Sequence, residues 1–245
     1  MKIKKRLVAS LAFSALALAG AQVAAAAALN LSDGDTIKLT REASNYGGAF
    51  GGGEFVANGV NVLNGAGDSF LTFCVEYSEH ISLNTNYYVK INTGAVNGGI
   101  GSDATYAGDV AGTSVFDPLS NATAWLYTQY RDNTLTGFSN TSASANALQL
   151  AIWKLEDELG GDALTAYNGN ALAQQWVADA TTAGWTDTGN VRILNLYTDA
   201  AFTNRAQDQL YITPVPEPEI YAMMAAGLGL MAFVARRRQR NGAVA

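Results

Sequence analysis

Cys74 is the only cysteine in the 245-residue chain, and it is the side chain best suited to covalent chemistry. A thiolate is a strong nucleophile. Cysteines of extracellular proteins are normally paired in disulfides, which a lone cysteine cannot form within its own chain. Two interpretations therefore remain open: Cys74 is either a small buried hydrophobic side chain or a nucleophile whose partner lies elsewhere in the sequence.

Other side chains are weaker candidates for catalysis or metal binding. His80, the only histidine, lies near Glu76 and Glu79, but the local pattern is that of a strand and helical spacing would be needed to gather the three on one metal-binding face. The acidic run Glu156–Glu158 ends a predicted helix, where charged residues mostly face solvent. The segment Asn30–Asp35 is rich in oxygen ligands but lacks EF-hand spacing. We therefore expect no catalytic residue, no metal ion and no cofactor, and a protein that is not an enzyme.

The chain from Leu29 to about Gly112 is predicted to form β-strands. It is rich in Gly, Asn and Thr, with short runs of β-branched and aromatic residues. The predicted strand segments are Thr36–Thr40, Phe55–Val56, Val60–Val62, Phe70–Val75 and Tyr87–Ile91, with turns at Asn58-Gly59, Asn64-Gly65 and Asn97-Gly98. The glycine cluster at Gly47-Gly48 and Gly51–Gly53 is expected to be a flexible loop.

From Asn121 the spacing of apolar residues becomes helical. Helices are predicted over Ala122–Tyr130 with Asn121 as the cap, over Ala145–Leu159 with Gly160-Gly161 as the stop, and over Ala171–Ala180. Strand character returns at Val191–Tyr197 and Gln209–Ile212. The expected ectodomain fold is mixed β and α: a β-sandwich or barrel with a small helical insertion.

Two short stretches offer Cys74 a partner. Phe73-Cys74-Val75-Glu76 ends a predicted strand, and Leu148-Gln149-Leu150-Ala151-Ile152-Trp153 lies in a predicted helix. Together they resemble the two halves of the thioester domains found at the tips of Gram-positive surface adhesins, in which a strand Cys and a Gln in a Gln-x-Ala-Ile-Trp helix form an internal thioester. The resemblance implies a thioester-like ectodomain over residues 29–213, with Cys74 and Gln149 as the reactive pair. It also implies an apolar setting supplied by Phe73, Ile152 and Trp153.

The chemistry of such a bond explains these residue types. A thiolate attacks the Gln side-chain carbonyl, ammonia leaves, and the resulting thioester stays electrophilic towards amines and hydroxyls. The pair must be held close together and shielded from water until a target arrives. In the alternative interpretation, Ile152 and Trp153 are ordinary core residues and Gln149 is a hydrogen-bonded polar group. Both interpretations remain open at this stage.

The N-terminus has the pattern of a secretory signal peptide. Basic Lys2–Arg6 precedes an apolar run from Leu7 to Gly20, and small residues continue to Ala28. A basic flank, a short apolar core and Ala-x-Ala sites are what export and signal peptidase require. We therefore expect residues 1–28 to be a signal helix that is removed, with the cleaved bond between Ala21 and Leu29.

The C-terminus carries a more specific pattern over residues 214–245. The proline-rich Val215-Pro216-Glu217-Pro218 cannot continue a helix or a central strand, because proline lacks an amide hydrogen. It is followed by the uncharged segment Ile220–Ala235, expected to be a short transmembrane helix. A basic cluster expected to stop transfer at the cytoplasmic face comes next: Arg236, Arg237, Arg238 and Arg240. This order resembles the PEP-CTERM sorting signal, whose tails are recognised and removed by an exosortase in Gram-negative bacteria that make extracellular polysaccharide.

The charge of the ectodomain limits its partners. Residues 29–213 carry seven basic and nineteen acidic side chains, a formal charge of −12. A surface with this much negative charge repels the phosphates of nucleic acids. We therefore expect no nucleic-acid partner.

Taken together, the patterns predict a protein of the cell surface or extracellular matrix with a role in adhesion or biofilm. Its expected partners are signal peptidase, exosortase, the inner membrane during transit, and extracellular polysaccharide or a nucleophile on a surface protein. Adhesion to animal tissue is not carried over from the adhesins, because the tail indicates a Gram-negative cell. The alternatives are a passive polysaccharide-binding or structural matrix protein, and a secreted hydrolase.

Overall fold

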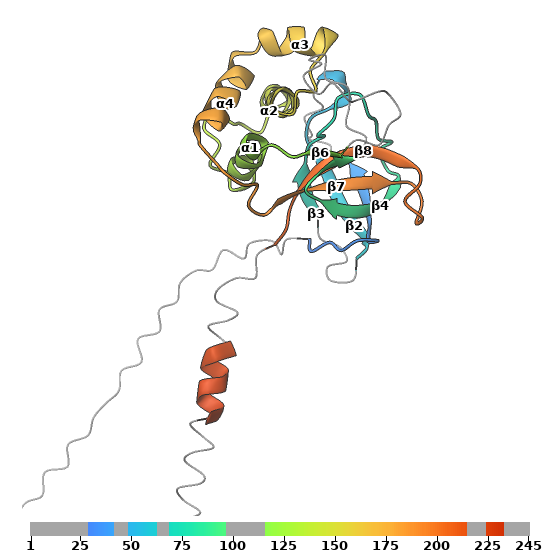
Figure 1. The fold of residues 1–245 in the computed structure, drawn as a ribbon, viewed down its shortest axis with the longest axis vertical. Helices are drawn as coiled ribbons and strands as arrows, with labels where there is room; N and C mark the ends of the chain where they lie inside the picture. Colours follow the sequence, from blue (N-terminus) through green and yellow to red (C-terminus); the bar gives the residue numbers. More distant parts are fainter. Residues whose placement is uncertain (1–28, 42–48, 63–68, 97–115, 215–223, 233–245) are drawn as a thin grey trace, which may run out of the picture.

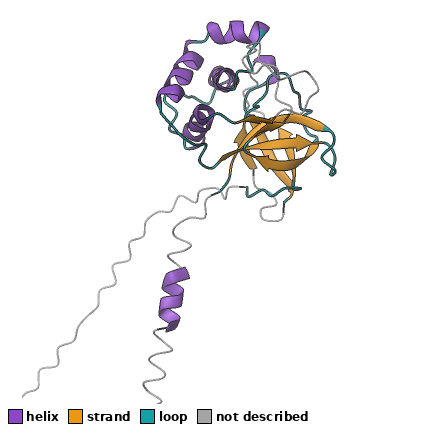
Figure 2. Cartoon of the chain, in the orientation of Figure 1, coloured by secondary structure: helices purple, strands orange, loops and turns teal. Residues whose placement is uncertain are grey.

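The computed structural model describes residues 29–41, 49–62, 69–96, 116–214 and 224–232. In this part of the chain, a β-sheet and a group of helices lie side by side (Figures 1 and 2). The strands are β1 (Thr36–Thr40), β2 (Phe55–Asn61), β3 (Ser69–Thr72), β4 (Asn86–Asn92), β5 (Gly94–Val96), β6 (Phe116–Pro118), β7 (Val191–Tyr197) and β8 (Arg205–Ile212). The helices are a short 3-10 turn, η1 (Ala49–Gly51), and α1 (Asn121–Arg131), α2 (Ser142–Leu155), α3 (Gly161–Asn168) and α4 (Ala171–Thr182).

Six of the strands form one antiparallel sheet in the order β3-β2-β1-β4-β7-β8, and β5 pairs separately with β6. The period-two pattern of a strand sets the buried face: Ile37 and Leu39 in β1 are buried. Tyr87 and Val89 in β4 are buried too, whereas Lys90 between Val89 and Ile91 is exposed. The expected mixed fold with an antiparallel β part is thus confirmed.

The two edges of the six-stranded sheet meet through the segment that follows β3. The Val75 N–H donates to the Asp208 carbonyl of β8 at 3.1 Å, and Cys74 forms an isolated antiparallel bridge with Gln209. The sheet is therefore joined edge to edge at this corner, and Cys74 lies at the join. Of the two architectures expected, this closure favours the barrel over the sandwich.

The predicted turn at Asn58-Gly59 is wrong, because β2 continues through it. Asn58 pairs with Lys38 of β1 and Gly59 with Ile37, and the register shifts just beyond, between Ile37 and Thr36. A glycine inside a strand often marks such a bulge. The turns predicted at Asn64-Gly65 and Asn97-Gly98 lie outside the described residues.

The helical insertion runs from α1 to α4, between β6 and β7, and its capping differs in detail from the prediction. Ser120, and not Asn121, is the N-cap of α1, since its side chain accepts from the Thr123 N–H. Helix α2 ends at Leu155, before the two glycines, because Asp157 adopts a left-handed conformation with φ 58°. Helix α3 was not predicted.

Helix α2 lies at the centre of the helical part and is buried on every side over Ala147–Trp153. Its neighbour α1 is tied to the closed corner of the sheet. There the Tyr127 hydroxyl donates to the Leu71 carbonyl at 2.7 Å. The sheet and the helices therefore share one core, and α2 faces the corner that carries Cys74.

The terminal segments are described only in part. The described stretch of the tail is an exposed helix over residues 224–232. Among the described residues, no helix has both the length and the apolar character that crossing a bilayer requires. The expected transmembrane helix thus stays a prediction. The signal segment 1–28, the motif Val215–Pro218 and the arginines of 236–240 lie outside the described residues.

Candidate functional site

Gln149 occupies an unusual position for a polar side chain, because it is fully buried within α2, at the centre of the helical part. A buried amide without hydrogen bonds would cost roughly 1–3 kcal/mol per unpaired group. Its neighbours Leu148 and Leu150 supply the packing that holds α2 in place. The burial therefore requires that the Gln149 amide be satisfied by specific partners.

The main partner of Gln149 is the backbone of Cys74. The Cys74 N–H donates to Gln149 Oε1 at 3.1 Å, and Gln149 Nε2 donates back to the Cys74 carbonyl at 2.8 Å. The side-chain amide thus pairs with Cys74 as a neighbouring strand would. The fold thus brings Cys74 and Gln149 into direct contact, although they are 75 positions apart in the sequence.

A second backbone donor also reaches the Gln149 carbonyl oxygen. The Gly53 N–H donates to Gln149 Oε1 at 3.1 Å, so this oxygen accepts from two N–H groups. Gly53 has φ +106°, a conformation that suits glycine. The arrangement is that of an oxyanion hole, in which two fixed dipoles point at one carbonyl oxygen.

In the Gly51–Gly53 stretch, which was expected to be a flexible loop, Gly52 and Gly53 are instead buried in the described structure, whereas Gly51 is exposed. A Cβ on Gly52 would lie 2.5 Å from Trp153 Cη2 and 2.7 Å from Gln149 Cγ. The Arg41 guanidinium donates to the Gly51 and Gly52 carbonyls at 2.8 and 3.2 Å. These glycines form a wall of the site. The glycine cluster in the sequence could have predicted this packing, because glycines without a Cβ allow other side chains to come close to the backbone. Gly47-Gly48 lies outside the described residues.

The Cys74 thiol is held by Gln207 of β8. Sγ donates to Gln207 Oε1 at 2.9 Å, and Gln207 Nε2 donates to the Glu76 carbonyl at 2.7 Å. Burial raises the pKa of the Cys74 thiol to about 12. The thiol is therefore neutral and kept from solvent. Sequence patterns did not identify Gln207.

The resemblance implied an apolar setting supplied by Phe73, Ile152 and Trp153, and of these the structure places Trp153 beside the Gln149 side chain, across Gly52. Trp153, Ile152 and Phe73 are all buried. Trp153 packs edge-on against Tyr77 at 5.1 Å, and Tyr77 packs edge-on against Phe50 at 6.0 Å. Phe50 is 41% exposed. A row of three rings therefore leads from the surface to Trp153, beside the Gln149 side chain.

The acidic side chains behave differently from the prediction. Glu156 and Glu158 are buried, so the expectation that Glu156–Glu158 faces solvent is wrong for both. Glu156 accepts from Ser120 Oγ at 2.7 Å, at the start of α1. Burial raises the pKa of Glu156 to about 7 and that of Glu158 to about 8. Glu156 thus supports the start of α1, whereas Glu158 accepts from the Tyr77 N–H at 3.3 Å.

The comparisons with known proteins bear on the tail. Residues 214–238 match the family model of the PEP-CTERM protein-sorting motif. Comparison with curated proteins and with solved structures found no match. The chain therefore carries the sorting motif of an exported, surface-directed protein that is processed by an exosortase, as the order of the tail predicted. None of these comparisons supports the resemblance of the ectodomain to thioester domains, which therefore stays a prediction from the sequence.

Proposed function

We propose that the ectodomain forms an internal thioester between Cys74 Sγ and Gln149 Cδ, and that the protein uses this bond to capture a nucleophile at the cell surface or in the matrix. The supporting observation is the convergence of the Gly53 and Cys74 N–H groups on Gln149 Oε1. When sulfur adds to Cδ, negative charge develops on Oε1, and these two donors stabilise it.

The bond-forming step balances without a co-reactant. Sγ bonds to Cδ, the Cδ–Nε2 bond breaks, and the thiol proton leaves with Nε2 as ammonia. Gln207 holds the thiol through Sγ until the step occurs. Full burial of Cys74 and Gln149 keeps water from hydrolysing the product.

The hydrogen bond from Gln149 Nε2 to the Cys74 carbonyl favours an amine as the captured group. Loss of ammonia leaves that carbonyl without this donor. An attacking primary amine brings a new N–H to the place of Nε2, whereas an alcohol brings only an oxygen, which would face the carbonyl oxygen. The captured group is therefore an amine of a surface protein or of an amino sugar in the matrix.

Labelling with methylamine tests this proposal. Exported protein treated in its native state should carry methylamine at Gln149 and a new free thiol at Cys74, both located by peptide mapping. The Cys74→Ala variant is the matched control and should take up none. Methylamine absent from Gln149 in the wild type would contradict the proposal.

A second candidate function, passive binding of polysaccharide, is favoured by a surface hollow between α1 and α4. The hollow has a volume of about 430 Å³, and its lining includes Trp125, Gln129 and Asp179. An aromatic face beside amide and carboxylate groups is a common setting for a sugar. Trp125→Ala should then release the protein from matrix polysaccharide, while Gln149→Glu should not. The opposite pattern would favour covalent capture.

A further inference from the structure

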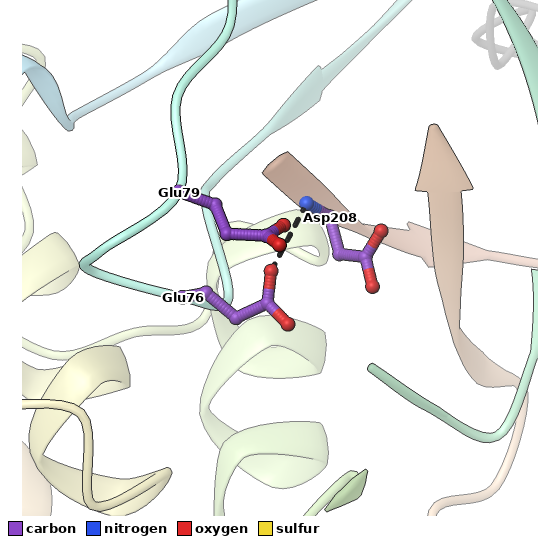
Figure 3. Close-up of side chains that lie close together, drawn as sticks. All are labelled: Glu76, Glu79 and Asp208. Carbon is purple, nitrogen blue, oxygen red and sulfur yellow. Dashed lines mark hydrogen bonds between the residues drawn. The ribbon is translucent and has the colours of Figure 1, made fainter. Parts of the chain in front are cut away.

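The carboxylates of Glu76, Glu79 and Asp208 come together at the closed corner of the sheet (Figure 3). Glu76 and Glu79 lie in the segment that follows β3, and Asp208 lies on β8. One oxygen from each lies within 4.8 Å of the others. His80, which the sequence grouped with the two glutamates, is exposed, and its place is taken by Asp208, 128 residues further along the chain.

The buried oxygen atoms without a hydrogen-bond partner among the described residues include two that bear on this cluster. One is Glu76 Oε1, on a side chain that is fully buried. The other is Asn195 Oδ1 of β7, which is not part of the acidic cluster. The Asn195 head group nevertheless lies against it, because its Nδ2 donates to Asp208 Oδ2 at 2.6 Å. A buried oxygen left without a donor is costly, and a cation satisfies such an oxygen as well as a donor does.

Asp208 is fixed in position but is not saturated. The Val96 N–H donates to its Oδ2 at 2.9 Å, and the Leu196 N–H donates to its Oδ1 at 3.3 Å. A carboxylate has about four lone-pair positions, so Oδ1 keeps room for a further contact.

We propose that Glu76, Glu79 and Asp208, with the Asn195 carbonyl oxygen, form a binding site for a calcium ion. The donors are all oxygen, the set that a hard cation prefers. Oxygens on opposite sides of a calcium ion, each bound at about 2.4 Å, are about 4.8 Å apart, and one oxygen from each carboxylate lies within this distance of the others. The ion joins the segment that carries Cys74 to β7 and β8. This inference does not depend on the thioester, because none of its ligands belongs to the Cys74–Gln149 pair.

Calorimetric titration of the purified exported protein with CaCl₂, after treatment with EDTA, tests this site. We expect one ion per chain, with a Kd of about 10⁻⁴ to 10⁻³ M, the range of extracellular calcium modules. Calcium at ten times its Kd should stabilise the fold by about 1.4 kcal/mol and so raise the melting temperature by about 3–6 °C. Magnesium should bind more weakly, because it demands a tighter octahedral set.

Variants separate a calcium site from a merely buried acidic cluster. Glu79→Gln, on a half-buried side chain, should weaken calcium binding at least tenfold while the protein stays folded. Asn195→Leu should weaken it too, and Glu156→Gln, which changes a buried carboxyl elsewhere, should leave the Kd unchanged. No calcium binding by the wild-type protein up to 10 mM would overturn the proposal, as would an unchanged Kd in Glu79→Gln. Methylamine uptake at Gln149 is scored separately, so either proposal can fail without the other.

Discussion

The side-chain amide of Gln149 exchanges two hydrogen bonds with the backbone of Cys74, so that a helix residue occupies the place of a neighbouring strand. On its other side, Cys74 bridges Gln209 of β8. The cysteine is thereby fixed between the helical insertion and the closing edge of the sheet. A substitution in the helical insertion or at the closing edge of the sheet should therefore disturb the Cys74–Gln149 site.

Gly52 is the residue whose substitution should damage the site most selectively. In Gly52→Ala the new Cβ would overlap Trp153 and the Gln149 side chain. We expect a loss of about 1–3 kcal/mol in the free energy of unfolding, measured by urea denaturation, and a lower thioester yield. Gly51→Asn is the control, since asparagine tolerates a positive φ and the space beside Gly51 is open. Equal stability of Gly52→Ala and wild type would contradict the packing described.

Phe50 should limit access to the site, because it is the exposed end of the row of rings that reaches Trp153. Phe50→Ala should therefore speed methylamine incorporation at Gln149, followed by mass spectrometry over time, without preventing thioester formation. Phe116→Ala, which removes another exposed ring, on β6, should have no effect. A rate unchanged in Phe50→Ala would show that targets enter by another route.

Stability should fall as the pH rises, and Glu156 should account for part of the fall. Its pKa is about 7 in the folded protein and near 4.5 in the unfolded chain, so between these values the folded state binds more protons. Its contribution to the free energy of unfolding is therefore intact below pH 4.5 and is lost as the pH passes 7, on the order of a few kcal/mol. Urea denaturation at pH 5 and pH 8 measures the difference. Glu156→Gln should shrink it, whereas Asp132→Asn, at an exposed site, should not. A pH dependence that Glu156→Gln leaves unchanged would refute the assignment.

Processing of the tail should depend on Pro216 and Pro218. Replacing both by alanine should leave the C-terminal segment attached and the protein in the inner membrane, as seen by fractionation and intact mass. Pro214→Ala, just outside the tripeptide, should be processed normally. Wild-type protein released from cells with its full tail would show that no exosortase cleaves it.

Periodicity in the sequence predicted β7 and most of α1, α2 and α4, because their apolar spacing is regular. It missed α3, whose segment begins with two glycines, and ended α2 too late, because Asp157 takes the left-handed position expected of a glycine. Asn58-Gly59 was mistaken for a turn because the pairing of β2 with β1 overrides local turn preference.

The pair Cys74 and Gln149 was predicted from the resemblance to thioester domains, but most of its surroundings were not. Gln207 and Gly53 become neighbours of the pair only through tertiary contacts. Gln207 lies beside Cys74 because β8 closes the sheet. Gly53 contacts Gln149 because the chain after η1 directs the Gly53 N–H towards α2. The meeting of Glu76 and Glu79 with Asp208 has the same cause. No local spacing encodes a contact made by sheet closure, so these residues lay beyond sequence patterns.

The mass of the intact exported protein is the most direct test of the proposed thioester. We predict that the folded wild type weighs less than its processed sequence by one ammonia, with Cys74 resistant to alkylation in the native state. Cys74→Ala and Gln149→Glu should each have the full mass of their own sequences. A wild-type mass equal to the full processed sequence, together with a Cys74 that alkylating reagent modifies in the folded protein, would contradict the thioester.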